Sequence, residues 1–210
     1  LLTSMETPIG RNIGNWLETR EAIEWLQGRD DLTEVNELTL TLGAEVLDAV
    51  GKGPFDAAYQ RLEQHWRSGR GLEIFAKIVA AQGGDPKVIE HPEIMPTAPV
   101  IEYIRAPRDG FLNGANALWF GKAGITLGAG RRVVSDTIDP LAGFRFLKSW
   151  GDPVEAGEII AEIHGSDRLV AMGIASRASE QLHIDETAKP LASWIIQRYP
   201  QTRDKASRKG

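Results

Sequence analysis

The stretch that decides the fold is LLTSMETPIGRNIGNWLETREAIEWLQG, residues 1–28. Its apolar opening, Leu1 and Leu2, is typical of the end of a buried strand. From residue 12 to residue 27 apolar side chains return at the helical period, and Gly28 can end that helix. Because the sequence opens in a strand and without a Met, we expect it to begin inside a larger fold.

Three more segments of the first half are predicted to be amphipathic helices. Residues 31–50, 54–69 and 72–82 repeat apolar residues at helical spacing and end at glycine. Asp31 followed by Glu34 resembles an N-cap pair. The expected inward side chains are Val35, Leu38, Leu42, Val46 and Val50 in the first segment and Leu72, Phe75, Ile78 and Val79 in the last.

The pattern changes after residue 90. Prolines at positions 92, 96 and 99 disfavour a helix and predict an extended connector, so we place a domain boundary near residue 97. Residues 97–200 are predicted to form a compact α+β module, and the polar residues 201–210 a loose tail. Strands are expected at 100–105, 143–148, 158–164 and 191–199, the middle two as a hairpin, and helices at 116–127 and from Asp167 to about 182.

Composition narrows the function classes. A net charge of -5 and a pI near 5.5 argue against a surface for nucleic acid or anionic membrane. The absence of cysteine excludes disulfides, thiolate zinc sites and a cysteine nucleophile, and fits a reducing compartment, with the cytoplasm as the default. No apolar run approaches the length of a membrane span, about 18 residues.

Residues 2–22 resemble the strand–loop–helix signature of the thymidine phosphorylase (pyrimidine nucleoside phosphorylase) family, T-x-M-x-x-P-L/I-G-x-x-x-G-N-x-x-E-x-x-E-A. Further matches follow in the same order, at residues 40–43, 80–85, 127–131 and 136–139. The resemblance reaches from residue 1 to about residue 199. It implies an α/β (α+β) fold, in which residues 1–96 are the C-terminal part of the catalytic α/β domain and residues 97–200 are the family's C-terminal α+β domain.

The resemblance implies phosphate-dependent cleavage of thymidine, uridine or deoxyuridine to the free base and a pentose 1-phosphate. Family members are about twice as long, and their phosphate loop and pyrimidine-contacting residues lie before the point that matches Leu1. Since phosphorolysis needs both sites, we expect this chain alone to be inactive and its partner to be the missing N-terminal half. Relatives are usually dimers through upstream helices, so a homodimer is left open.

The resemblance also implies a potassium site and no organic cofactor. Relatives hold the ion with main-chain carbonyls of the loop and with one helical carboxylate, and these positions match Ile9, Asn12 and Glu21. Oxygen ligands suit a hard cation. A carbonyl does not depend on its side chain, so Glu21 is the residue to test; the alternative is that it is a solvated helix carboxylate.

Other motifs favour plainer interpretations. Gly128-Ala129-Gly130-Arg131-Arg132 could cradle a phosphate, but a turn that ends a helix is the more ordinary explanation. The hairpin at 151–157 is similar to that of biotinyl and lipoyl carriers, but no lysine signature accompanies it. The four histidines lack metal-site spacing: His65, His91, His164 and His183. A free-standing binding or scaffold module therefore remains the main alternative to the enzyme.

Overall fold

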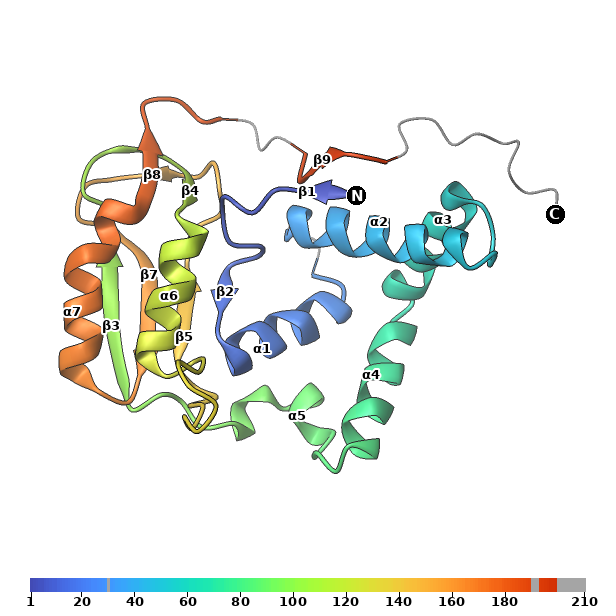
Figure 1. Cartoon of the computed structure of the whole chain (residues 1–210), viewed down its shortest axis with the longest axis horizontal. Coiled ribbons are helices and arrows are strands. Elements are labelled where there is room, and N and C mark those ends of the chain that lie inside the picture. The colour runs from blue at the N-terminus through green and yellow to red at the C-terminus, as the bar shows by residue number, and fades with distance from the viewer. Residues whose placement is uncertain (30, 190–192, 200–210) are drawn as a thin grey trace.

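We describe the chain from a computed structural model, which describes residues 1–29, 31–189 and 193–199. Figure 1 shows a helical part, with α2, α3 and α4, beside a mixed part in which strands are flanked by α6 and α7. The helices are α1 Asn15–Leu26, α2 Thr33–Ala49, α3 Phe55–Arg67, α4 Arg70–Ala81, α5 Lys87–Glu90, α6 Ala117–Leu127 and α7 Arg168–Ala178, with 3-10 turns at Pro92–Ile94 and Ser179–Gln181. Among these residues no helix is both long and apolar enough to cross a membrane.

The strands form three antiparallel sheets. The largest has the order β2-β5-β7-β3, the second β6-β4-β8, and the smallest pairs β1 with β9. Their bounds are β1 Leu2–Thr3, β2 Asn12–Ile13, β3 Val100–Arg105, β4 Gly110–Ala115, β5 Gly143–Phe146, β6 Pro153–Val154, β7 Ile159–Gly165, β8 Leu182–Asp185 and β9 Ile195–Gln197. Helices and sheets together make the fold α+β, as the sequence predicts.

The main core lies in the mixed part, between the sheets and helices α6 and α7. Phe120 on α6 is fully buried and meets Phe144 and Phe146 of β5 edge-on, with ring centroids 5.0 and 5.2 Å away. Such edge-to-face pairs add stability beyond the area they bury. Trp150 extends the row from Phe146 at 5.0 Å. The predicted hairpin is confirmed, because β5 and β7 pair directly.

A smaller core joins the first three helices. Trp25 of α1 stacks on Trp66 of α3, with ring centroids 5.2 Å apart and planes 11° from parallel. The indole N–H of Trp66 donates to the carbonyl oxygen of Trp25, and that of Trp25 donates to the side chain of Asn36 on α2. Leu32 is fully buried against the same cluster. Two tryptophans therefore tie three helices together.

Several predicted inward side chains are exposed. The inward stripe of α2 is wrong at Leu42, Val46 and Val50, which are 46%, 62% and 62% exposed. Leu38 is buried as predicted, but the buried face continues through Thr41, Ala44 and Asp48. Ile78 of α4 is likewise exposed, and so are Leu1 and Leu2 at the strand that opens the chain. Periodicity finds a helix but does not say which of its faces a neighbour covers.

The predicted N-cap of α2 is also wrong. Leu32 occupies that position without a side-chain cap, because the Asp31 carboxylate binds Arg11 and Arg29 instead. In α7 the prediction holds, since Asp167 accepts from the N–H groups of Leu169 and Val170.

The structure also differs from the sequence-based predictions in the proline connector and near the end of the chain. The proline connector contains the 3-10 turn Pro92–Ile94, which places a proline at a first helical position, where its missing N–H costs nothing. The helix expected to reach about residue 182 ends at Ala178, and residues 182–185 form strand β8. Of the last expected strand, β9 is present, whereas residues 190–192 and the tail from residue 200 lie outside the described residues.

Segments near both ends of the chain connect the helical part with the mixed part. β2, near the N-terminus, pairs with β5 at the edge of the large sheet, and β1 pairs with β9 close to α2 (Figure 1). Ser193 and Trp194 donate to the carboxylate of Glu37 on α2. The boundary near residue 97 stays a prediction, and the parts on its two sides share a sheet.

Candidate functional site

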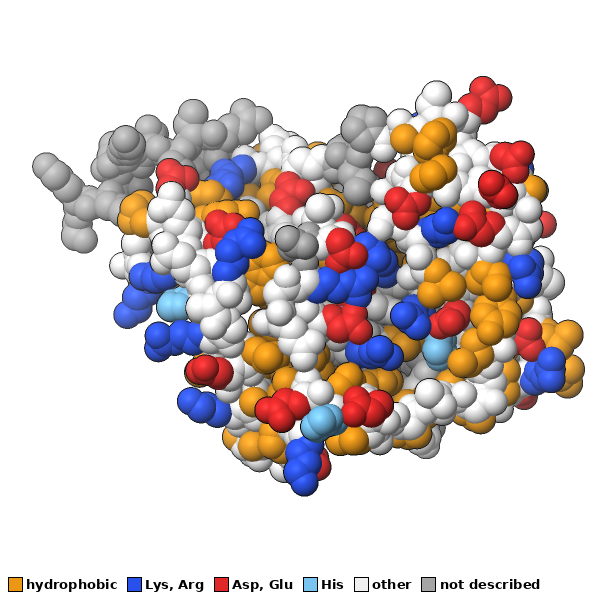
Figure 2. Space-filling model, turned by 180° about the vertical axis from the view of Figure 1, so that it is seen from behind, with side chains coloured by type: hydrophobic (Ala, Val, Ile, Leu, Met, Phe, Trp, Pro, Cys, Tyr) orange, Lys and Arg blue, Asp and Glu red, His pale blue; other side chains and the backbone are white. Residues whose placement is uncertain are grey.

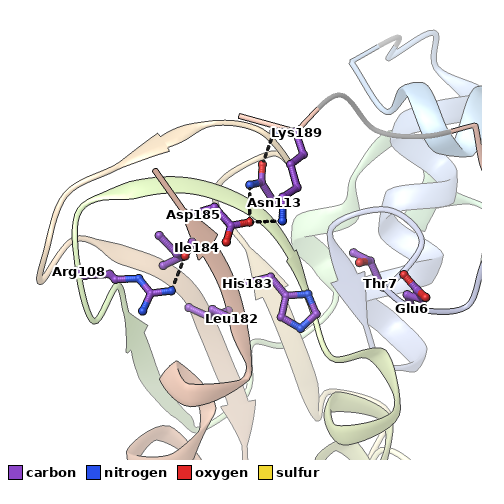
Figure 3. Close-up of a pocket in the computed structure, with 9 residues that line it drawn as sticks. All are labelled: Glu6, Thr7, Arg108, Asn113, Leu182, His183, Ile184, Asp185 and Lys189. Atoms are coloured by element: carbon purple, nitrogen blue, oxygen red, sulfur yellow. Dashed lines mark hydrogen bonds and ion pairs between the residues drawn. The ribbon is translucent and has the colours of Figure 1, made fainter. Parts of the chain in front are cut away.

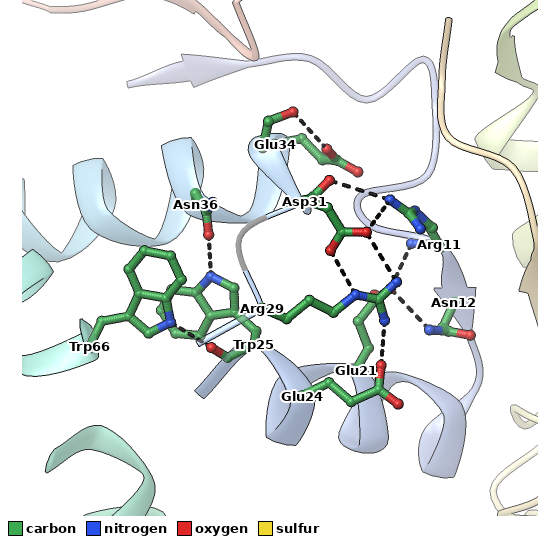
Figure 4. Close-up of polar contacts among 11 residues, drawn as sticks. Arg11, Asn12, Glu21, Glu24, Trp25, Arg29, Asp31, Glu34, Asn36 and Trp66 are labelled. Atoms are coloured by element: carbon green, nitrogen blue, oxygen red, sulfur yellow. Dashed lines mark hydrogen bonds and ion pairs between the residues drawn. The ribbon is translucent and has the colours of Figure 1, made fainter. Parts of the chain in front are cut away.

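The loop between β1 and α1 wraps around the carboxylate of Glu21. Glu21 lies on α1 and is 6% exposed. Its Oε1 accepts from the backbone N–H of Arg11 and from the side-chain amide of Asn12, each at 2.9 Å (Figure 4). The helix therefore aims one carboxylate into the bend of the preceding loop, and Glu21 is not the solvated helix residue of the plainer interpretation.

Gly10 makes the close approach of loop and carboxylate feasible. Its φ is +72°, a backbone conformation that residues with a side chain rarely adopt. A Cβ at this position would lie 2.2 Å from Oε2 of Glu21. The loop therefore packs its backbone directly on the carboxylate, and only glycine fits there without rearrangement.

Burial raises the pKa of the Glu21 carboxyl above its ordinary value, because an ion is costly to remove from water. The hydrogen bonds from Arg11 and Asn12 and the nearby Arg29 charge act in the opposite direction, and Glu34 adds a smaller upward effect. Since desolvation is the largest effect, the ionised form gains from any further positive charge nearby.

The other two predicted ligands lie on the same loop. The carbonyl of Arg11 accepts from Phe146 N at 2.7 Å, on the side where β5 pairs with β2. Because successive carbonyls of a strand point in opposite directions, that of Asn12 faces the open edge of β2. Ile9 immediately precedes Gly10 and is 52% exposed. The structure thus brings the loop that carries Ile9 and Asn12 together with Glu21.

An ion-pair network that the sequence does not reveal borders this loop. Arg11 Nη2 lies 2.8 Å from Asp31 Oδ2, and Arg29 Nε lies 2.7 Å from Asp31 Oδ1 (Figure 4). The side-chain hydrogen bond from Arg29 is the main cause that lowers the pKa of Asp31. The charges are visible in the sequence, but only the tertiary fold shows that residues 11 and 31 meet.

Apart from the Glu21 loop, the structure has a hollow between the N-terminal loop and β8. It has a volume of about 480 Å³ and is lined in part by Glu6, Thr7, His183 and Asp185. Figure 3 shows His183 and Asp185 on one side and Glu6 and Thr7 on the facing loop. Asp185 is paired with Lys189, so the lining mixes both charges. No sequence motif points to this hollow, because its lining comes from three stretches that lie far apart in the sequence.

The glycine-rich motif at residues 128–132 takes no part in these sites. Gly128 adopts a left-handed conformation at the end of α6, which agrees with a turn that terminates a helix. Among the described residues no group of three or more His, Asp or Glu side chains is arranged to hold a metal. On the face in Figure 2 acidic and basic side chains are interspersed, with apolar ones between them.

Known proteins resemble this chain over most of its length. The family model of the pyrimidine nucleoside phosphorylase C-terminal domain matches residues 111–185. The pyrimidine-nucleoside phosphorylase of Staphylococcus haemolyticus (strain JCSC1435) is 36% identical over 192 residues, which are 90% of this chain and 43% of that protein. That of Staphylococcus aureus (strain USA300) is 40% identical over 170 residues, 79% of this chain and 38% of that protein. The family resemblance is confirmed, and the chain spans less than half the length of these relatives.

Proposed function

We propose that this chain, which carries the pyrimidine nucleoside phosphorylase C-terminal domain and is homologous to such enzymes over most of its length, is the C-terminal part of a pyrimidine nucleoside phosphorylase. The observation that carries the proposal is the similarity over 90% of the chain, which extends well beyond the C-terminal domain itself. The complete protein would use phosphate to cleave thymidine, uridine or deoxyuridine into base and pentose 1-phosphate, in the cytoplasm.

In that enzyme the chain would form one wall of the substrate cleft and support domain closure. The described residues offer a loop folded over a buried carboxylate, whereas the phosphate loop and the pyrimidine contacts expected of the family match nothing in residues 1–210. Phosphorolysis becomes fast when the enzyme positions both phosphate and nucleoside. A chain without the expected phosphate and pyrimidine sites cannot position them. The 210-residue chain alone is therefore expected to be inactive.

The potassium site is part of the same proposal. The carbonyls of Ile9 and Asn12 and the carboxylate of Glu21 offer hard oxygen ligands on one bend of the chain. A buried carboxylate whose pKa is raised by desolvation gains from a cation beside it. When bound, potassium would supply the positive charge that fixes this loop, and the loop in turn would support the phosphate region of the missing half.

An ultraviolet assay of thymidine and uridine phosphorolysis tests the enzyme proposal. It is run on the 210-residue chain, on the product of the complete reading frame, and on a mixture of this chain with the preceding half. We expect activity from the complete product and none from the chain alone. If the complete product is inert while the short chain binds another protein, the chain is a scaffold module instead.

The potassium site is tested separately by thermal unfolding. The chain and its Glu21→Gln variant are melted in potassium chloride and in choline chloride of equal ionic strength. A ligand that binds only the folded state raises the melting temperature with its concentration. We expect potassium to stabilise the parent chain more than the variant; an equal response of the two proteins would remove the assignment of Glu21.

A further inference from the structure

Four arginines from three segments of the chain line one small cavity. Arg11 follows the loop after β1, Arg20 lies on α1, Arg29 follows α1, and Arg145 is on β5. The cavity has a volume of about 110 Å³ and lies beside the Glu21 loop, whose Asn12 also lines it. Residues so far apart in the sequence meet because β2 pairs with β5, with Asn12 opposite Arg145.

The lining of this cavity is strongly positive. Glu24 is the one acidic side chain among its described lining residues. It is shared, since Oε1 accepts from Arg20 Nε at 3.0 Å and Oε2 from Arg29. Asp31 and Glu162 hold arginines from outside the lining, and Glu162 also contacts His164 at 3.0 Å. The carboxylates therefore orient the guanidinium groups without filling the cavity with negative charge.

Two of the arginines are fixed and two keep donors to spare. Arg11 and Arg29 are anchored by Asp31, and the Arg11 side chain is only 16% exposed. Arg20 uses its Nε for Glu24, and Arg145 approaches its cross-strand partner Glu162 at 3.6 Å. A guanidinium carries five N–H donors in a planar fork that suits the oxygens of phosphate. Among the described residues, most donors of Arg20 and Arg145 have no hydrogen-bond acceptor.

Apolar side chains close the other side of the cavity. Leu17 and Phe146 are buried at 6% and 2% exposure, and Leu147 completes the lining. A charge-assisted hydrogen bond is stronger where water is partly excluded, because the local dielectric is lower. The cavity thus combines preorganised positive charge with an apolar side that partly excludes water.

We propose that Arg11, Arg20, Arg29 and Arg145 form a binding site for a phosphate-type oxyanion, either free phosphate or the phosphate group of a sugar ester. Arg11 and Arg29 hold the positive frame, and Arg20 and Arg145 donate to the ligand oxygens. The ligand's charge offsets the mutual repulsion of the guanidinium groups. Binding at this site requires only residues of this chain and does not depend on the proposed phosphorolysis.

The test is a titration of the 210-residue chain with inorganic phosphate and, separately, with ribose 5-phosphate, by isothermal calorimetry at constant ionic strength. We expect saturable binding at millimolar concentration or below, displaced by sulfate. The probe that binds more tightly identifies the source of the oxyanion. The variants Arg20→Gln and Arg145→Gln should each weaken binding about tenfold, since each removes a charge-assisted contact.

Arg67→Gln is the matched control. Arg67 pairs with Glu63 across one helical turn at 3.0 Å, as Arg20 pairs with Glu24, but it lies outside the cavity. The Arg20 and Arg145 side chains are 45% and 47% exposed, so their variants should keep the parent circular dichroism spectrum and melting temperature. No saturable binding by the parent chain, or an equal loss in Arg67→Gln, would overturn the proposal.

Discussion

At the scale of single residues, Glu21 is a buried carboxylate whose pKa is raised by its surroundings. It is a carboxylate on the first turns of a helix, yet a backbone loop covers it and supplies two donors. The donors compensate only part of the desolvation, because the pKa of Glu21 is still raised. A carboxyl group with a raised pKa makes the free energy of unfolding depend on pH, and the sign of that dependence can be measured.

Glu21→Gln should remove one component of the pH dependence. Because the folded pKa lies above the ordinary 4.5, the folded chain binds more protons than the unfolded one between these two values. The free energy of unfolding of the parent therefore falls as the pH rises through this window, and that of the variant does not. Urea unfolding from mildly acidic to neutral pH should show the variant gaining relative to the parent.

Glu158→Gln is a control of opposite sign for that experiment. The hydrogen bond from Lys148 is the main cause that lowers the pKa of Glu158, so this carboxylate stabilises the fold once it is ionised. Its variant should lose stability relative to the parent as the pH rises through the window below the ordinary value of 4.5. A difference between parent and Glu21→Gln that stays constant with pH would contradict the burial argument.

Gly10→Ala should destabilise the fold by about 2 kcal/mol or more, through backbone strain and contact with Glu21. The φ of +72° and the 2.2 Å approach to Oε2 act together at this position. Gly157→Ala separates the two effects, because its φ is +83° but nothing lies within 4 Å of its Cβ. Chemical denaturation should show the larger loss for Gly10→Ala, and equal losses would mean that the carboxylate does not pack there.

At the scale of elements, the stacked pair Trp25 and Trp66 holds α1, α2 and α3 together. The α3 helix has few other buried side chains, with Ala58 beside Trp66. No residue of α4 is buried, so this end of the helical part depends on few contacts. Helices of such length are marginal alone in water and need a packed face.

Trp66→Ala should therefore cost about 3–5 kcal/mol, since it removes a buried ring and leaves a cavity. Trp66→Phe keeps a ring for the stack but loses the N–H that donates to the carbonyl of Trp25, so an intermediate loss is expected. Thermal unfolding followed by far-ultraviolet circular dichroism measures both. A loss below about 1 kcal/mol in Trp66→Ala would show that other contacts hold the three helices.

Much of the element order follows from the sequence. Helical spacing and terminal glycines locate α1 to α4, and Asp167 marks the start of α7. Strand β8 escapes detection because it has only four residues, Leu182–Asp185, directly after a helical segment. Its pairing with β4, 67 positions earlier at Ala115 and Leu182, is a long-range event that local periodicity does not encode.

At the scale of the whole molecule, the position of each helix decides which of its faces is covered. α2 carries two apolar stripes, one through Leu38 and one through Val46. Leu38 is buried and α2 packs on α3, whereas Val46 is exposed. The sequence pattern predicts both Leu38 and Val46 to face inward, although only Leu38 is buried.

Leu38→Ala and Val46→Ala compare the two stripes within one helix. Leu38 is 5% exposed, so its truncation should cost about 2–5 kcal/mol, whereas Val46, at 62% exposure, should change the stability by about 0.5 kcal/mol or less. Urea unfolding of the two variants gives the comparison. Similar losses would mean that Val46 is covered in solution.

The sequence by itself determined the resemblance to pyrimidine nucleoside phosphorylases, the α+β class and most helices, and it singled out Glu21, because these depend on local spacing and on short motifs such as residues 2–22. Only the tertiary structure decided that Asp31 binds arginines instead of capping α2, and that Arg11 and Arg145 share a cavity. The shared cavity depends on strands β2 and β5 meeting across more than a hundred residues. A charged or apolar side chain can pair with many others equally well. The path of the folded chain decides which of these possible partners it meets.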